Sequence, residues 1–176
     1  MATYVETPER LIVPNRRAEW RIEYDPAKRI PLLASRRVVV LMRAMKRRKR
    51  IVIRGSDDVG DMLGASALND REAVYLLLLD AKQRVMGVYV VGLGGPSSSV
   101  VDLTTLMRVV LATDPTGGVI LVHNHPSGDQ IASPEDVMLT ERLVRAVDFF
   151  GYTLLDHVVI AGGGYFSFAE SGLLSD

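Results

Sequence analysis

Residues 123–136 contain the side chains whose types and spacing are best suited to chemistry. The stretch reads His-Asn-His-Pro-Ser-Gly-Asp-Gln-Ile-Ala-Ser-Pro-Glu-Asp, so that His123, His125 and Asp136 fall close together in the chain. Two imidazoles and one carboxylate are the ligand set of a catalytic zinc ion, which keeps its fourth position open for water. A structural zinc ion normally takes four protein ligands, often thiolates, and this chain has no cysteine. The segment therefore predicts hydrolysis by a zinc-bound water.

Two predicted elements would bring these ligands together. Residues 118–122 predict a buried strand that leads into His123, and side chains two positions apart on an extended chain point to the same side. Ser133 is a typical helix N-cap and the proline after it suits the first turn, so Asp136 falls at the third position of a helix predicted over 134–150. The dipole of that helix favours the ionised carboxylate, which is the form that binds a metal.

Each part of this stretch also has an ordinary structural explanation. Ser-Pro-Glu-Asp is a common way to begin a helix, and an isolated His-x-His often serves a turn. Both together, behind a buried strand and with Pro-Ser-Gly turning the chain between them, favour a metal site. The letters His-Asn-His do not indicate an HNH nuclease, whose three residues lie far apart in sequence.

The rest of the chain predicts strands mixed with helices around one sheet, which is an α/β or α+β sandwich. The predicted strands are 51–53, 73–79, 85–91, 118–122, 154–160 and 165–168, and the predicted helices are 56–63, 103–112 and 134–150. Residues 38–45 fit either a short helix or a strand. The glycine-rich loop at 92–99 has no following Gly-Lys-Ser or Gly-Lys-Thr, so it does not predict a phosphate cradle.

Composition indicates a globular chain of one domain with an extension. Of 176 residues, 48% are hydrophobic and 24% are charged, which is enough apolar material for a core. The apolar runs are too short to cross a bilayer, so we expect no membrane association. The first residues show no signal-peptide pattern, which makes a cytoplasmic location the expectation. The lack of cysteine excludes disulfides and a cysteine nucleophile.

The formal net charge of zero conceals an uneven distribution. Residues 1–60 carry 15 lysines and arginines against 7 acids, a net of +8, whereas residues 61–176 carry 6 against 14, a net of −8. We expect a basic extension over 1–50, ending in the block Lys-Arg-Arg-Lys-Arg, and one domain over 51–176. The extension would either dock on the acidic domain or bind a polyanion such as nucleic acid.

The spacing of the ligands resembles a known family. His-x-His, seven residues, Ser, two residues and Asp is similar to the JAMM (MPN+) zinc metalloprotease motif. The string His-Asn-His-Pro-Ser-Gly-Asp, with Leu-Asp-His at 155–157 and Ser-Phe-Ala-Glu at 167–170, resembles the RadC branch in particular. The resemblance covers about residues 51–174. RadC proteins usually carry an N-terminal helix-hairpin-helix module, but its glycine-hairpin signature is not found in residues 1–50.

The resemblance implies a fold, a cofactor and a mechanism. The fold is a JAB/MPN (cytidine deaminase-like) three-layer α/β sandwich with a mixed sheet flanked by helices, and zinc is held by His123, His125 and Asp136. Zinc lowers the pKa of its bound water from about 16 to about 7. The family's catalytic glutamate matches Glu72, which would take the proton from that water and pass it to the leaving amine. Ser133 would help to hold the oxyanion of the tetrahedral intermediate.

Three further residues have alternative roles. Asn124 lies between the ligands and could orient the loop or a substrate carbonyl, and the structural role is favoured. His157 is expected to satisfy Asp156 or a backbone carbonyl, with a hydrogen bond to a metal-bound histidine as the alternative. Asp129 is a candidate acceptor for the second ring nitrogen of such a histidine.

Three hypotheses of function follow. The first is a zinc-dependent hydrolase that cleaves a peptide or isopeptide bond in a protein or peptide substrate. The second is a DNA-associated repair or recombination accessory protein with a non-catalytic zinc site, which binds phosphates through its basic residues. The third is a mobile-element or defence protein that trims a modifier by the same chemistry, and the sequence does not separate it from the first.

Overall fold

The computed structural model of the chain describes residues 51–64, 72–93 and 101–174, together with the backbone of three short strands nearer the N-terminus. These strands are β1 (Ile12–Asn15), β2 (Ala18–Arg21) and β3 (Val39–Leu41). The basic block at 46–50 and the glycine-rich loop at 94–99 lie outside the described residues.

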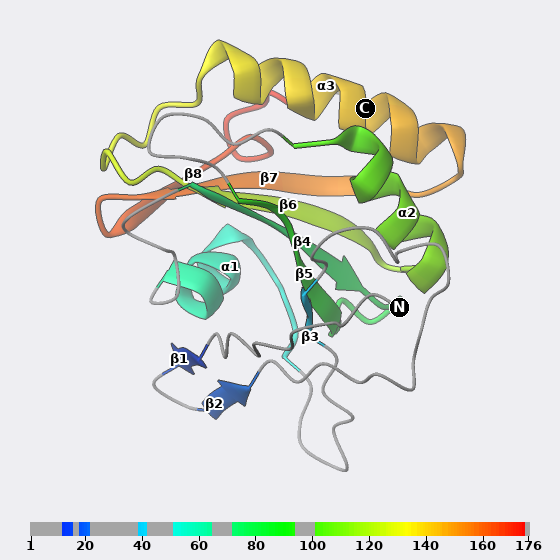
Figure 1. The fold of residues 1–176 in the computed structure, drawn as a ribbon, viewed down its shortest axis with the longest axis horizontal. Coiled ribbons are helices and arrows are strands. Elements are labelled where there is room, and N and C mark those ends of the chain that lie inside the picture. Colours follow the sequence, from blue (N-terminus) through cyan, green and yellow to red (C-terminus); the bar gives the residue numbers. More distant parts are fainter. Residues whose placement is uncertain are drawn as a thin grey trace, which may run out of the picture.

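Three helices and five strands follow β3 along the chain (Figure 1). In order they are α1 (Ser56–Leu63), β4 (Ala73–Leu79), β5 (Val85–Leu93), α2 (Leu103–Thr113), β6 (Gly118–Asn124), α3 (Pro134–Phe149), β7 (Leu154–Ala161) and β8 (Gly164–Ser167).

The larger sheet has six strands in the order β3-β5-β4-β6-β7-β8. Within it, β6 and β7 run parallel and the other neighbouring pairs run antiparallel, so the sheet is mixed. Helix α3 is the crossover that joins the parallel pair. Helices α2 and α3 cover one face of the sheet and α1 covers the other, which gives three layers (Figure 1). The predicted α/β three-layer sandwich is confirmed.

Side-chain alternation along the strands divides the core into two halves. In β4, Val74, Leu76 and Leu78 pack with α2 and α3. The intervening Tyr75 and Leu77 pack with α1 on the opposite face. All seven residues of β4 and all seven of β6 are buried, as expected for central strands covered on both sides. Each residue of these strands can therefore be assigned to a face.

The predicted elements from residue 56 onwards form at or near their predicted bounds. Strand β6 runs two residues further than predicted, so that His123 and Asn124 belong to it. Residues 51–53 were expected to form a strand, but the structure gives only a single bridge between Val52 and Arg84. The reason lies on the partner side, because Gln83, next to Arg84 in the turn between β4 and β5, has a positive φ of 57° and is not extended.

Part of the predicted extension contributes to the larger sheet. Strand β3 pairs with β5 at one edge, whereas β1 and β2 form a separate two-stranded sheet. The predicted domain boundary at residue 50 stays a prediction. Among the described helices, none combines the length and the apolar character that a membrane span requires.

Candidate metal centre

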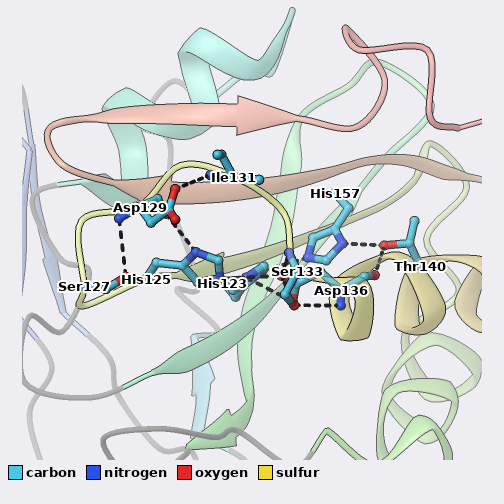
Figure 2. A network of polar contacts seen from close by, with 9 residues as sticks. All are labelled: His123, His125, Ser127, Asp129, Ile131, Ser133, Asp136, Thr140 and His157. Carbon is cyan, nitrogen blue, oxygen red and sulfur yellow. Dashed lines mark hydrogen bonds and ion pairs between the residues drawn. The ribbon is translucent and has the colours of Figure 1, made fainter.

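Two histidines and one aspartate converge at the end of β6, where their side chains could hold a metal ion. One ligand atom from each of His123, His125 and Asp136 lies within 4.8 Å of the others. The two Nε2 atoms of the histidines lie 2.8 Å apart. Asp136 Oδ1 lies 3.3 Å from His123 Nε2, and Asp136 Oδ2 lies 3.5 Å from His125 Nε2. Figure 2 shows the three side chains pointing toward one another.

Strand β6 sets the positions of the two histidines. Val119 and Leu121 face α2 and α3, so the alternation of the strand places His123 on the same face. His125 follows one residue after the strand, and its backbone N–H donates to Ile160 O at 2.9 Å, which keeps the chain extended alongside β7. Both imidazoles therefore project to the side where α3 begins, as the His-x-His spacing predicted.

The first turn of α3 supplies the carboxylate through a capping box. Ser133 is the N-cap, and its Oγ accepts from the backbone N–H of Asp136 at 3.1 Å. In return Asp136 Oδ2 accepts from the Ser133 backbone N–H at 2.8 Å and from its hydroxyl at 2.7 Å. The predicted cap and the predicted metal ligand are therefore the same local structure, in which Oδ2 is held by Ser133 and Oδ1 faces His123.

The residues around Asp136 keep its carboxyl group ionised by lowering its pKa. Burial alone would raise the pKa of this carboxyl. A protonated His123 ring donates a hydrogen bond to this carboxylate and adds its positive charge; together with the hydrogen bonds from Ser133, these effects outweigh burial and hold the pKa of Asp136 well below its usual range. The carboxylate is therefore ionised at neutral pH, the form that could bind a metal ion.

A backbone carbonyl orients His125. Its Nδ1 lies 2.8 Å from Asp129 O, and a carbonyl can only accept, so the proton of the neutral ring is on Nδ1 and the lone pair is on Nε2. The prediction that Asp129 supplies an acceptor for the second ring nitrogen of a histidine is confirmed, and the acceptor atom is its backbone carbonyl oxygen. The carboxylate of Asp129 instead accepts from Ile131 N at 2.9 Å, because it closes the turn of its own loop.

His157 orients the other histidine of the cluster. Its Nε2 lies 2.8 Å from His123 Nδ1, and its Nδ1 lies 2.6 Å from Thr140 Oγ1 (Figure 2). The favoured prediction, that this ring satisfies Asp156 or a backbone carbonyl, is therefore wrong, and the alternative, a contact with a histidine of the proposed metal site, is confirmed. Asp156 and His157 are neighbours on a strand, so they point to opposite faces. The carboxylate of Asp156 bonds to Ser56 and Ser167 on the α1 side.

The ring of His157 is fixed in an apolar environment. It is fully buried and stacks on Phe168, with the ring centroids 4.7 Å apart and the planes 13° from parallel. Burial lowers the pKa of His157 well below its usual value, and the neighbouring charge of His123 adds to this effect. The ring is consequently neutral, with one nitrogen as donor and the other as acceptor.

Thr140 is a functional candidate that the sequence reasoning missed. It lies four residues after Asp136 on α3, and it is buried together with Leu143 and Val147. The sequence did contain one indication, because a threonine four residues after the predicted ligand Asp136 lies on the same face of the predicted helix. The sequence could not show that His157 lies opposite it.

Asn124 has a structural role at the β4–β6 junction, as predicted. Its Oδ1 accepts from the backbone N–H of Ala73 at 2.8 Å, which extends the contact between the two strands beyond their backbone ladder. In that ladder Val74 lies opposite His123. Glu72 lies two residues before Val74 and one before the start of β4, so an extended backbone over 72–74 would place it on the face of His123. Glu72 is half-buried and comes directly before the strand, and it is not a member of the three-residue cluster.

The donor set fits a bound metal ion. In the neutral His125 ring the Nε2 lone pair faces a carboxylate at 3.5 Å, which places two acceptors against each other. A cation between them would remove this repulsion. Imidazole nitrogen and carboxylate oxygen together suit divalent transition metals such as zinc, and three protein ligands leave room for water.

A protein-family model described as "RadC-like JAB domain" matches residues 53–173, which is more than half of the chain. The chain is also similar to curated bacterial proteins that bear the name "UPF0758 protein". The one from Desulforamulus reducens is 34% identical over 150 residues, covering 85% of this chain and 66% of that protein. The one from Thermotoga maritima is 41% identical over 105 residues, covering 60% of this chain and 47% of that protein. The chain thus spans about half to two thirds of the length of these relatives.

Proposed function

The chain belongs to the RadC-like JAB domain family, and on that premise we propose that it is a zinc-dependent hydrolase that cleaves a peptide or isopeptide bond. One observation carries the proposal. Two imidazoles from the end of one strand and one carboxylate from the start of one helix bring their ligand atoms within 4.8 Å of one another. The names of the relatives state no activity, so the proposed reaction rests on the chemistry of the site.

The metal would supply the Lewis-acid chemistry of the reaction. When bound, zinc makes water acidic and polarises a carbonyl group. His123, His125 and Asp136 would hold it, and their imidazole and carboxylate atoms are suited to this ion. The protein would supply the remaining functions through its own residues.

Glu72 is the proposed general base. An extended backbone over 72–74 would place it on the face that carries His123, and the bond from Ala73 N to Asn124 Oδ1 holds the adjacent backbone against β6. The carboxylate would accept a proton from the attacking water and deliver it to the leaving amine. A positioned general base of this kind contributes roughly 10²- to 10⁴-fold to the rate.

Ser133 has two proposed uses. Its hydroxyl donates to Asp136 Oδ2 at 2.7 Å, so one role is to orient that ligand. The predicted role at the oxyanion of the substrate would require this hydroxyl to turn away from Asp136 during the reaction. The capping of α3 favours the first role, since both bonds of the capping box are formed.

The test of the proposal combines metal content with turnover on a library of lysine-isopeptide and linear peptide substrates. We expect about one zinc ion per chain and chelator-sensitive cleavage that zinc restores. Glu72→Gln should retain zinc and cleave at least about 100-fold more slowly. Glu141→Gln is the control, because that exposed residue of α3 pairs only loosely with Arg145 at 3.7 Å. A chain that binds no zinc, or a Glu72→Gln variant that cleaves at the native rate, would contradict the proposal.

The charge of the first 60 residues favours a second candidate, an accessory protein that binds nucleic acid. Their net charge of +8 would attract phosphates, and such binding would weaken steeply with salt. The test is a mobility shift of DNA by the full chain at two salt concentrations. The variant for comparison has all five basic residues at 46–50 replaced by glutamine. Unlike a truncation, this change keeps strand β3. No shift at low salt would exclude this candidate.

A further inference from the structure

A chain of hydrogen bonds joins the backbone of α3 to the ring of His123. Thr140 Oγ1 lies 2.6 Å from Asp136 O and 2.6 Å from His157 Nδ1. His157 Nε2 then lies 2.8 Å from His123 Nδ1 (Figure 2). The contact between Thr140 and His157 is slightly shorter than a usual N–H···O bond, the other two have normal hydrogen-bond lengths, and Thr140 and both histidines are buried.

The direction of these bonds follows from the first one. The carbonyl oxygen of Asp136 can only accept, so the single hydroxyl proton of Thr140 is donated to it. Thr140 Oγ1 is then left as an acceptor toward His157. The proton in that second contact must therefore belong to His157 Nδ1.

The same reasoning gives the position of the proton on His123. The buried His157 ring, stacked on Phe168, is neutral and carries one proton. Because that proton is on Nδ1, Nε2 has a lone pair and accepts from His123 Nδ1. When the His123 ring is neutral, its own lone pair is therefore on Nε2, which lies 3.3 Å from Asp136 Oδ1 and 2.8 Å from His125 Nε2. His123 Nε2 is the nitrogen that a metal in the cluster would need.

We propose that Thr140 and His157 are positioning residues that keep the proton of His123 on Nδ1 and leave Nε2 free to bind metal. The proposal rests on the proposed function only in taking zinc as the ion at this site. The chain of hydrogen bonds begins at the backbone carbonyl of Asp136 and ends at His123, whose Nε2 lies next to the carboxylate of the same Asp136. Helix α3 therefore positions two ligands together, one on its first turn and the other through Thr140.

The test uses Thr140→Val, which keeps the side-chain volume and removes the acceptor. Without it the His157 proton is free to move to Nε2, where it would oppose the Nδ1 proton of His123 and favour protonation of the ligand nitrogen. Loss of such a partner typically weakens metal affinity about 10- to 100-fold, and we expect this range for zinc measured by chelator competition. Thr140→Ser retains the hydroxyl and should restore the affinity to within about threefold of native, since one hydroxyl replaces another.

Thr113→Val is the matched control. Thr113 makes the same bond one turn back along α2, from Oγ1 to Val109 O at 2.6 Å, but it has no part in the metal cluster. The variant should therefore bind zinc as the native chain does. If removing any helical threonine hydroxyl weakened zinc binding through a loss of stability, both variants would show the effect. The proposed chain of hydrogen bonds predicts weaker zinc binding in Thr140→Val alone.

A second readout is ¹⁵N NMR of the histidine rings in the metal-free full chain, at a pH where the imidazoles are neutral. We expect the proton of both His123 and His157 on Nδ1 in the native chain, and a shift of that proton toward Nε2 in Thr140→Val. A native His123 ring with its proton on Nε2 would overturn the proposal, as would a Thr140→Val variant that binds zinc as tightly as Thr113→Val. Failure to cleave any peptide would contradict the proposed function alone, because neither readout measures turnover.

Discussion

His157 Nε2 lies 2.8 Å from His123 Nδ1, although 34 residues separate the two histidines in the chain. The contact exists because β6 and β7 are parallel neighbours, so that residues on the same face of adjacent strands meet beneath α3. The third histidine of the chain, His157, therefore contacts the group of His123, His125 and Asp136 and is not a member of it.

Replacing Asp136 by asparagine should remove the metal. The substitution eliminates the negative charge that lies within 3.5 Å of both Nε2 atoms, and an amide is a poor ligand for zinc. We expect zinc content to fall from about one ion per chain to background in elemental analysis after dialysis. Glu141→Gln on the exposed side of α3 should keep its zinc. Full zinc content in Asp136→Asn would mean that the metal binds elsewhere.

Replacing Ser133 by alanine should destabilise the metal-free protein. The change removes the acceptor for the Asp136 backbone N–H and the hydroxyl donated to Asp136 Oδ2. Loss of such an N-cap typically costs about 1 kcal/mol of unfolding free energy, which urea denaturation would measure. Ser133→Thr keeps a hydroxyl at this position and should lie between native and alanine. Equal stability of all three proteins would show that the cap contributes nothing.

Replacing Asp156 by asparagine should destabilise the protein more strongly. This buried carboxylate accepts from the hydroxyls of Ser56 and Ser167 and from the backbone N–H groups of His157 and Ala169, which ties α1 and the C-terminal turn to β7. An amide offers one acceptor oxygen in place of two, and we expect a loss of about 2–3 kcal/mol in the unfolding free energy. Asp61→Asn changes an exposed residue of α1 and serves as the control. A cost no larger than that of the control would contradict this role.

Acid should destabilise the turn between β4 and β5. The hydrogen bond from the side chain of Arg84 lowers the pKa of Asp80 to about 2, against the opposing effect of burial, and backbone N–H groups add to the lowering. In the unfolded chain this pKa is about 3.9, so the folded state binds fewer protons at this group. The stabilisation is complete above about pH 4 and is lost as the pH falls toward about 2.

Two variants check this pH dependence by denaturation at a series of pH values. Asp80→Asn should lower the unfolding free energy at neutral pH and flatten its decline between about pH 4 and 2. Arg84→Gln removes the main cause of the lowered pKa and should flatten the same interval. An unchanged slope in both variants would assign the acid sensitivity to other carboxylates.

Much of the fold could be predicted from local patterns. The alternation and apolar runs of β4 to β8 and the helical spacing of α2 gave their approximate bounds, because these periods reflect burial on one face or two. The capping box of α3 was also readable, since Ser133 and Asp136 are three residues apart and act within one turn. The failure at residues 51–53 had its cause in the partner segment, where the positive φ of Gln83 in the β4–β5 turn limits the pairing to one bridge.

The three candidate metal ligands could be predicted from the sequence because they lie within fourteen residues, on a strand end and a helix start that the sequence defines. Tertiary structure decided what surrounds them. The parallel register of β6 and β7 brought His157 to His123, and the packing of α3 on that face brought Thr140 to His157. The antiparallel register of β4 and β6 placed Val74 opposite His123, two residues after Glu72. These contacts join residues from different elements, and no periodicity within one element specifies which residues of two elements will meet.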